Sequence, residues 1–332
     1  MSRQLFEYHP VIGYRYIPGI KARVPYEGGG YLIRVNRSGF RCRHEFAAAK
    51  PPGRLRVLLC GDSFTAGDGV SDGYRYGDLL EKLIPGLEVY NLALPGTGTD
   101  QQYLAYQEFG QGLEYDVLIL GVLVENILRV KARYRIYYNE QGDEVVYAKP
   151  YFELEDGELK LRQVPVPKEA LSKDQIPLEL RHTIDRGGRY PALRQLVKKL
   201  KLKNLAQRLT RYQPFPEYGN PQDLAWRLMR AILTDWIGRA PAKVLLVPIP
   251  FYQYVEETSD PEPYRARFME LARATGCALH DPLADLRRHP PEVRRGFRFA
   301  QDPHLTAAGH QALAESLAPA LRRLLGRGEQ PA

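Results

Sequence analysis

The sequence predicts an α/β fold in which helices cover both faces of a parallel sheet of about five strands. Short apolar runs of strand length recur at residues 56–60, 87–91, 115–121, 243–247 and 277–280. Helical segments follow most of them, at residues 76–84, 99–110, 262–275 and 307–325. Strands that alternate with helices form right-handed crossovers, and strands buried on both faces are continuously apolar. Together these patterns predict a three-layer core.

The first predicted strand, residues 56–60, runs directly into Gly61-Asp62-Ser63. Its apolar run is too short for a helix, and glycine bounds it. Ligands of parallel sheets bind beyond the carboxyl ends of the strands, so Ser63 is a candidate nucleophile. A Gly-Asp-Ser turn on its own is more often only a turn, with the aspartate accepting from nearby backbone amides. Asp62 is therefore expected to be structural.

Three further segments carry residue types that could complete a site around Ser63. They are Pro95-Gly96-Thr97-Gly98, Val124-Glu125-Asn126 and Asp302-Pro303-His304. The first two follow predicted strands, and the third precedes the last predicted helix. With Ser63, these blocks occur in the order typical of the SGNH (GDSL) hydrolases, and the chain resembles that family from about residue 56 to 315. The resemblance implies a flavodoxin-like core.

The resemblance also implies a catalytic triad and an oxyanion hole. Ser63 would be the nucleophile, His304 its base and Asp302 the carboxylate that orients the histidine, because a serine hydroxyl attacks only when an imidazole takes its proton. The oxyanion hole would consist of the backbone N–H groups of Ser63 and Gly96 and the side-chain amide of Asn126. The implied reaction is hydrolysis of a small acyl ester, for example an acetyl ester of a carbohydrate, without metal or cofactor.

Two departures from the family pattern concern this site. The family often has Gly-x-Asn-Asp where this chain has Val124-Glu125-Asn126-Ile127, so a charge stands next to the asparagine. Asp302 lies two residues before His304 rather than the more common three, and Gln301 occupies the third position. Three alternatives stay open: an acyltransferase with a sugar hydroxyl as acceptor, a catalytically silent carbohydrate-binding protein, and a nucleic-acid-binding protein.

Other motifs fail on their spacing. Gly67, Gly69 and Gly73 do not match the dinucleotide fingerprint, and no phosphate loop or zinc-ligand spacing occurs. His280 and His310 are expected to be structural, and Cys60 and Cys277 to be small core residues.

The chain has 47 Lys and Arg against 39 Asp and Glu, a net charge of +8. The basic residues are scattered except near Lys198–Lys203, so no nucleic-acid partner is expected. That stretch is interpreted as a solvated helical face, with an anionic partner such as a polysaccharide, a nucleotide-linked sugar or a membrane surface as the alternative. No apolar leader or membrane-length run occurs, which predicts a cytoplasmic protein. The oligomeric state cannot be read from these patterns.

The predicted core covers residues 55–126 and 240–327. Residues 1–54 are expected to form a β-rich extension, and 127–239 an inserted subdomain with hairpins at 135–147 and 152–161, a basic helix over 190–212 and a helix from Asn220-Pro221 through Trp236. Because the insertion begins after Asn126, it is expected to form a lid or substrate wall beside the oxyanion hole. Its tyrosines could stack on sugar rings or pack the hairpins together (Tyr134, Tyr137, Tyr138, Tyr147 and Tyr151).

Overall fold

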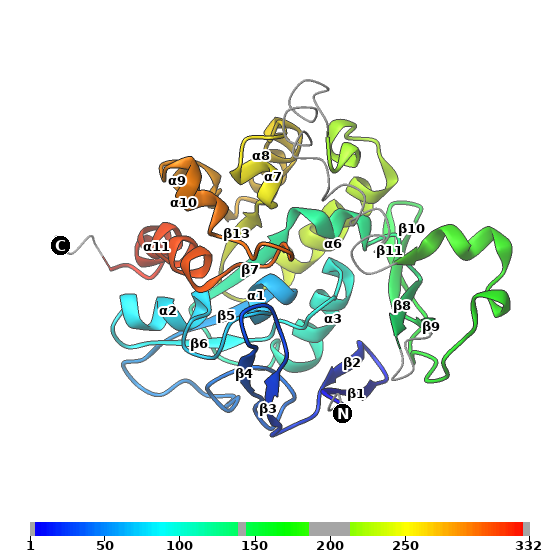
Figure 1. Ribbon diagram of the computed structural model, residues 1–332, viewed down its shortest axis with the longest axis horizontal. Coiled ribbons are helices and arrows are strands. Elements are labelled where there is room, and N and C mark those ends of the chain that lie inside the picture. Colours follow the sequence, from blue (N-terminus) through cyan, green and yellow to red (C-terminus); the bar gives the residue numbers. More distant parts are fainter. Residues whose placement is uncertain (1–3, 139–143, 186–212, 328–332) are drawn as a thin grey trace.

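The computed structural model of the protein describes residues 4–138, 144–185 and 213–327. Within these residues, the centre of the molecule is a parallel five-stranded sheet of order β14-β13-β7-β5-β6 (Figure 1). Its strands are β5 (Leu55–Gly61), β6 (Leu87–Asn91), β7 (Val117–Leu123), β13 (Lys243–Ile249) and β14 (Ala278–Leu279). This is the flavodoxin-like strand order, and it confirms the predicted fold class.

Strands β5 and β7 lie side by side in the middle of the sheet, with Leu59 opposite Ile119 and Gly61 opposite Gly121. Every residue of β7 is buried, as expected for a strand covered on both faces. The chain runs from β5 outward to β6 and then crosses back to β7. The carboxyl ends of β5 and β7 therefore form the point where the connections diverge, which is where ligands bind in such sheets.

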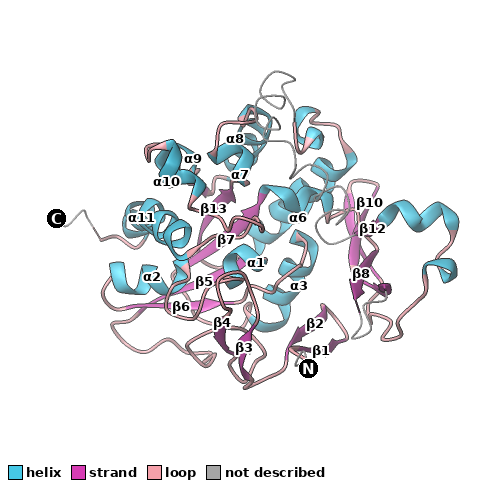
Figure 2. Cartoon of the chain, viewed as in Figure 1, coloured by secondary structure: helices cyan, strands magenta, loops and turns pink. Residues whose placement is uncertain are grey.

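The main helices form two groups, α2 (Tyr76–Leu83) with α11 (Ala307–Leu324), and α3 (Thr99–Phe109) with α6 (Leu224–Arg239) and α8 (Glu262–Thr275). Right-handed crossovers in opposite directions along the sheet place α2 and α3 on opposite faces (Figure 2). Helix α11 begins where Thr306 caps it by accepting from the Gly309 amide.

Shorter helical segments lie between these elements and in the insertion. They are α1 (Ser63–Ala66), α7 (Tyr252–Val255), α9 (Leu283–Arg287), α10 (Pro291–Arg295), η1 (Val124–Leu128), η2 (Lys173–Gln175), η3 (Leu178–Thr183) and η4 (Pro216–Gly219). None of the described helices is long and apolar enough to cross a lipid bilayer.

The predicted start of α6 at Asn220-Pro221 is wrong. The Asn220 side chain accepts from the Gln222 amide and forms a local turn instead. The helix begins at Leu224, where Asp223 caps it by accepting from the Ala225 amide at 2.8 Å. Trp226 and Trp236 on this helix are buried in the main core. The predicted basic helix over 190–212 lies outside the described residues.

The N-terminal extension forms two antiparallel hairpins, β1 (Phe6–His9) with β2 (Gly13–Tyr16) and β3 (Lys21–Val24) with β4 (Tyr31–Arg34). Both predicted hairpins of the insertion occur, β8 (Tyr134–Tyr138) with β9 (Glu144–Ala148) and β10 (Tyr151–Glu155) with β11 (Glu158–Arg162). Strand β12 (Ile184–Asp185) pairs with β8. Helix α6 joins the main core, whereas Ile136, Val146 and Ile176 form a small separate cluster. The domain boundaries stay a prediction.

Candidate active site

Ser63 lies in the turn directly beyond the end of β5, as the first residue of α1. Asp62 fixes this turn because its side chain accepts from the Phe64 amide at 3.0 Å. The Ser63 Oγ lies 2.7 Å from Nε2 of His304, and Nδ1 of His304 lies 2.5 Å from Oδ1 of Asp302. A hydroxyl, an imidazole and a carboxylate from opposite ends of the chain therefore form one continuous hydrogen-bonded row.

The short spacing between Asp302 and His304 is compatible with this row. Oδ1 of Asp302 accepts from the backbone N–H of His304 at 2.9 Å as well as facing its ring, so the same oxygen fixes both the loop and the imidazole. The loop is held from outside by Glu27, whose carboxylate accepts from the amides of Ala300 and Gln301 at 3.1 and 3.0 Å. This geometry does not need a carboxylate at position 301, because Asp302 supplies one.

The environment of the row stabilises an imidazolium–carboxylate pair. Burial alone would raise the pKa of Asp302, but the hydrogen bond and charge of His304, together with the Tyr26 hydroxyl, lower it below its usual value. Burial alone would lower the pKa of His304, but the hydrogen bond to Asp302 and the charges of Asp68, Asp302 and Asp62 raise it. His304 is thus suited to take a proton from Ser63.

Two neighbours of His304 were not found from the sequence. The hydroxyl of Tyr26, in the loop between β3 and β4, lies 3.0 Å from Nδ1 of His304. Asp68 follows α1, and burial raises the pKa of its carboxyl. Neither residue lies in a motif that would signal its role. The β3–β4 loop, which carries Tyr26, reaches the site only through the tertiary fold.

Asn126 lies in η1, directly beyond the end of β7. Its Nδ2 is buried and has no hydrogen-bond partner among the described residues. Its Oδ1 accepts from Nη1 of Arg129 at 3.0 Å, so the orientation of the amide is fixed with the NH₂ group left to donate elsewhere. A fixed, unused donor is what an oxyanion hole requires.

Arg129 joins the three segments that carry the predicted oxyanion-hole residues. Its Nη1 donates to Oδ2 of Asp62 at 3.0 Å and to the carbonyl oxygen of Thr97 at 3.3 Å, besides Asn126. Its Nη2 lies 3.1 Å from Oε2 of Glu125. This ion pair compensates the charge of Glu125, which departs from the family pattern. The only sequence signal for this role is its position one helical turn after Asn126.

Gly96 lies in the turn after β6, with φ +75, a conformation that favours glycine. A Cβ at this position would fall within 2.4 to 2.5 Å of the Arg135 guanidinium. The turn is held by Tyr14, whose hydroxyl donates to the Pro95 carbonyl oxygen at 2.5 Å. The extension, the insertion and the core thus meet at Gly96.

His280 and His310, expected from the sequence to be structural, make contacts outside the row of Ser63, His304 and Asp302. His280 faces Ser316, with 2.8 Å between Nε2 and Oγ. His310 is buried, its Nδ1 accepts from the Tyr76 amide, and burial with the charges of Arg41 and Arg75 lowers its pKa to about 3. Among the described residues, no three His, Cys, Asp or Glu side chains are grouped so as to hold a metal ion. Cys60 is buried and Cys277 half-buried.

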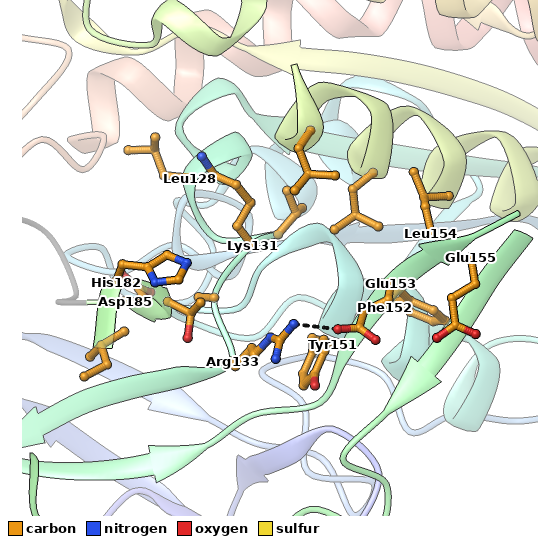
Figure 3. Close-up of a pocket in the computed structure, with 16 residues that line it drawn as sticks. Leu128, Lys131, Arg133, Tyr151, Phe152, Glu153, Leu154, Glu155, His182 and Asp185 are labelled. Atoms are coloured by element: carbon orange, nitrogen blue, oxygen red, sulfur yellow. Dashed lines mark hydrogen bonds and ion pairs between the residues drawn. The ribbon is translucent and has the colours of Figure 1, made fainter. Parts of the chain in front are cut away.

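A cavity of about 500 Å³ lies in the insertion, between β10, β12 and α6 (Figure 3). It is lined by Arg133, which pairs with Glu153, and by His182 and Asp185, but not by Ser63, His304 or Asn126. A hollow of about 330 Å³ adjoins the row itself and is bounded by Tyr26, Glu27, Gln301 and Asp302.

No family model matches the chain, and the comparison with curated proteins found no match. Solved structures resemble it at low identity. A member of the lipolytic G-D-S-L protein family from Veillonella parvula is 11% identical, with a TM-score of 0.45 over 81% of this chain and 99% of that one. A lipase/acylhydrolase from Enterococcus faecalis is 14% identical, with a TM-score of 0.44 over 83% and 100%. The acetyl xylan esterase AlAXEase is 13% identical, with a TM-score of 0.44 over 80% and 100%.

Proposed function

We propose that the protein is a serine hydrolase of the SGNH type that cleaves small acyl esters. The observation that carries the proposal is the row of Ser63, His304 and Asp302, with 2.7 Å between hydroxyl and imidazole and 2.5 Å between imidazole and carboxylate. These distances are within hydrogen-bonding reach for proton transfer, and the row lies at the strand ends where ligands of parallel sheets bind.

In the first step, the Ser63 oxygen attacks the ester carbonyl carbon and its proton passes to Nε2 of His304. Asp302 holds the other ring nitrogen and stabilises the imidazolium that forms. The tetrahedral intermediate collapses when His304 gives this proton to the leaving alcohol oxygen, which leaves the acyl group on Ser63. Water then attacks the acyl carbon by the same route, with His304 as base, and releases the carboxylic acid.

The negative charge that develops on the carbonyl oxygen needs donors already in place. Asn126 supplies its unpartnered Nδ2, and the backbone N–H groups of Ser63 and Gly96 are the other proposed donors. Arg129 holds the three segments together by donating to Asp62, Thr97 and Asn126. Its guanidinium also places positive charge behind the site.

Hydrolysis of a panel of short-chain esters tests the proposal, with acetyl, butyryl and acetylated-sugar esters compared between wild type and Ser63→Ala. Wild type is expected to hydrolyse at least one of them, and Ser63→Ala to lose essentially all turnover while keeping the thermal unfolding midpoint. Asp302→Asn is expected to lose most of the turnover, because the imidazole would then lack its orienting charge. Turnover that survives Ser63→Ala would refute the proposal.

A further inference from the structure

Strand β8 of the insertion brings the Arg135 guanidinium onto the Gly96 turn. A Cβ on Gly96 would lie 2.4 Å from Nη2 of Arg135 and 2.5 Å from Cζ and Nη1, so the guanidinium occupies the space that the missing side chain leaves. Glycine therefore suits this position for two reasons: it adopts the positive φ, and it leaves space for the arginine side chain. Arg135 thus reaches the Gly96 turn of the proposed oxyanion hole from β8.

The guanidinium of the half-buried Arg135 leaves part of its hydrogen-bonding capacity unused. Its Nε and Nη1 are buried and have no hydrogen-bond partner among the described residues. Nη1 forms an ion pair with Asp185, whose Oδ2 lies 3.7 Å away, beyond hydrogen-bonding distance. The Tyr137 ring is 5.4 Å from Cζ and offers its face, not an acceptor in the guanidinium plane. Buried N–H donors left without acceptors destabilise the fold, so such donors usually have an acceptor from the protein, from water or from a ligand.

We propose that Arg135 binds an anionic substituent, such as a carboxylate, that the ester substrate carries close to its scissile carbonyl; this inference rests on the proposed function. A guanidinium presents N–H donors in a planar fork that matches a carboxylate, and the bonds are charge-assisted. A substrate carbonyl oxygen held at the Gly96 turn brings the neighbouring substrate atoms next to Arg135. The substrate class is thus an acidic ester, either of a dicarboxylic acid or of an acidic alcohol.

Selectivity for a carboxylate distinguishes this role from a structural one. Methyl hydrogen succinate and methyl butyrate differ in a carboxylate on the acyl side, and 3-acetoxybenzoate and phenyl acetate differ in one on the alcohol side. In at least one pair, wild type is expected to have the higher kcat/KM for the anionic ester. Arg135→Gln is expected to lower that anionic-to-neutral ratio about tenfold or more, and Arg135→Lys to restore part of it.

Arg133→Gln is the matched control. It removes the same charge from the same segment, but Arg133 is paired with Glu153 and lines the separate cavity of Figure 3. The control is expected to leave both ratios unchanged. A structural role of Arg135, or a role at the reacting carbonyl, would lower anionic and neutral esters equally. Unchanged ratios in both pairs for Arg135→Gln would overturn the proposal.

Binding to a protein without its nucleophile tests Arg135 separately from catalysis. Calorimetric titration of Ser63→Ala with methyl hydrogen succinate and 3-acetoxybenzoate is expected to show binding of at least one, weakened about tenfold or more by adding Arg135→Gln. This result would stand even if wild type hydrolysed no ester, which would count against the proposed function alone. Equal affinity with and without Arg135, or binding of neither anion, would overturn the inference about Arg135.

Discussion

The turn after β7 and strand β8 each place an arginine beside the proposed oxyanion hole, and the two differ in what they contact. Arg129 donates to Asp62, Thr97 and Asn126 and pairs with Glu125. Arg135, six residues later, lies against Gly96 and is ion-paired with Asp185, but its Nε and Nη1 have no hydrogen-bond partner among the described residues. A guanidinium that donates to several neighbouring segments positions the residues around it, whereas one with unused donors is available to a ligand.

The largest effect is expected from Arg129→Met. Removing one partner of a buried ion pair leaves Asp62 uncompensated, and such changes lower the free energy of unfolding by about 3 to 5 kcal/mol. Turnover of anionic and neutral esters should fall together, because the three oxyanion-hole segments lose the hydrogen bonds from Arg129 that join them. Urea unfolding and kcat measure the two effects. Arg239→Met, which removes a surface pair with Asp235, is the control and should change little. Unchanged stability and turnover for Arg129→Met would contradict the comparison.

Asn126→Ala should affect turnover much more than stability. The lost Nδ2 has no hydrogen-bond partner in the part of the chain that the structure describes, so its main use is expected in the transition state. Removing one such donor typically lowers kcat by about 100- to 1000-fold. Steady-state kinetics and thermal unfolding on the same preparations check this. A kcat close to that of wild type would place the oxyanion elsewhere.

The smallest effect is expected from Asp68→Asn, on the pH dependence. His304 must be neutral to act as base, so kcat/KM falls as the pH drops through its pKa. The Asp68 charge contributes to raising that pKa, so its removal should move the acid limb of the profile to lower pH. Asp235→Asn is the control. It changes a carboxylate that bonds to Tyr103 and Arg239 rather than to His304, so it should leave the acid limb in place. A shift of the limb to higher pH would contradict the electrostatic description of the site.

Much of the fold and the candidate site could be predicted because both depend on local patterns. Apolar runs ending in polar turns indicate strand ends, and parallel strands bring their carboxyl ends to one edge, which is why Ser63 was identified. The role of Asn126 was predicted from the resemblance to the SGNH hydrolases. Tyr26, Arg129 and Arg135 were not identified, because their roles depend on how loops fold back over that edge. The start of α6 was misplaced because the Asn220 side chain satisfied a local turn rather than a helix.

The most direct test of the proposed active site is covalent labelling with a fluorophosphonate, followed by peptide mass spectrometry. The probe reacts with a serine only when a base and an oxyanion hole activate it. We expect one adduct, on Ser63, which Ser63→Ala abolishes and His304→Ala greatly slows. An intact protein that leaves Ser63 unmodified, or reacts at another serine instead, would contradict the account.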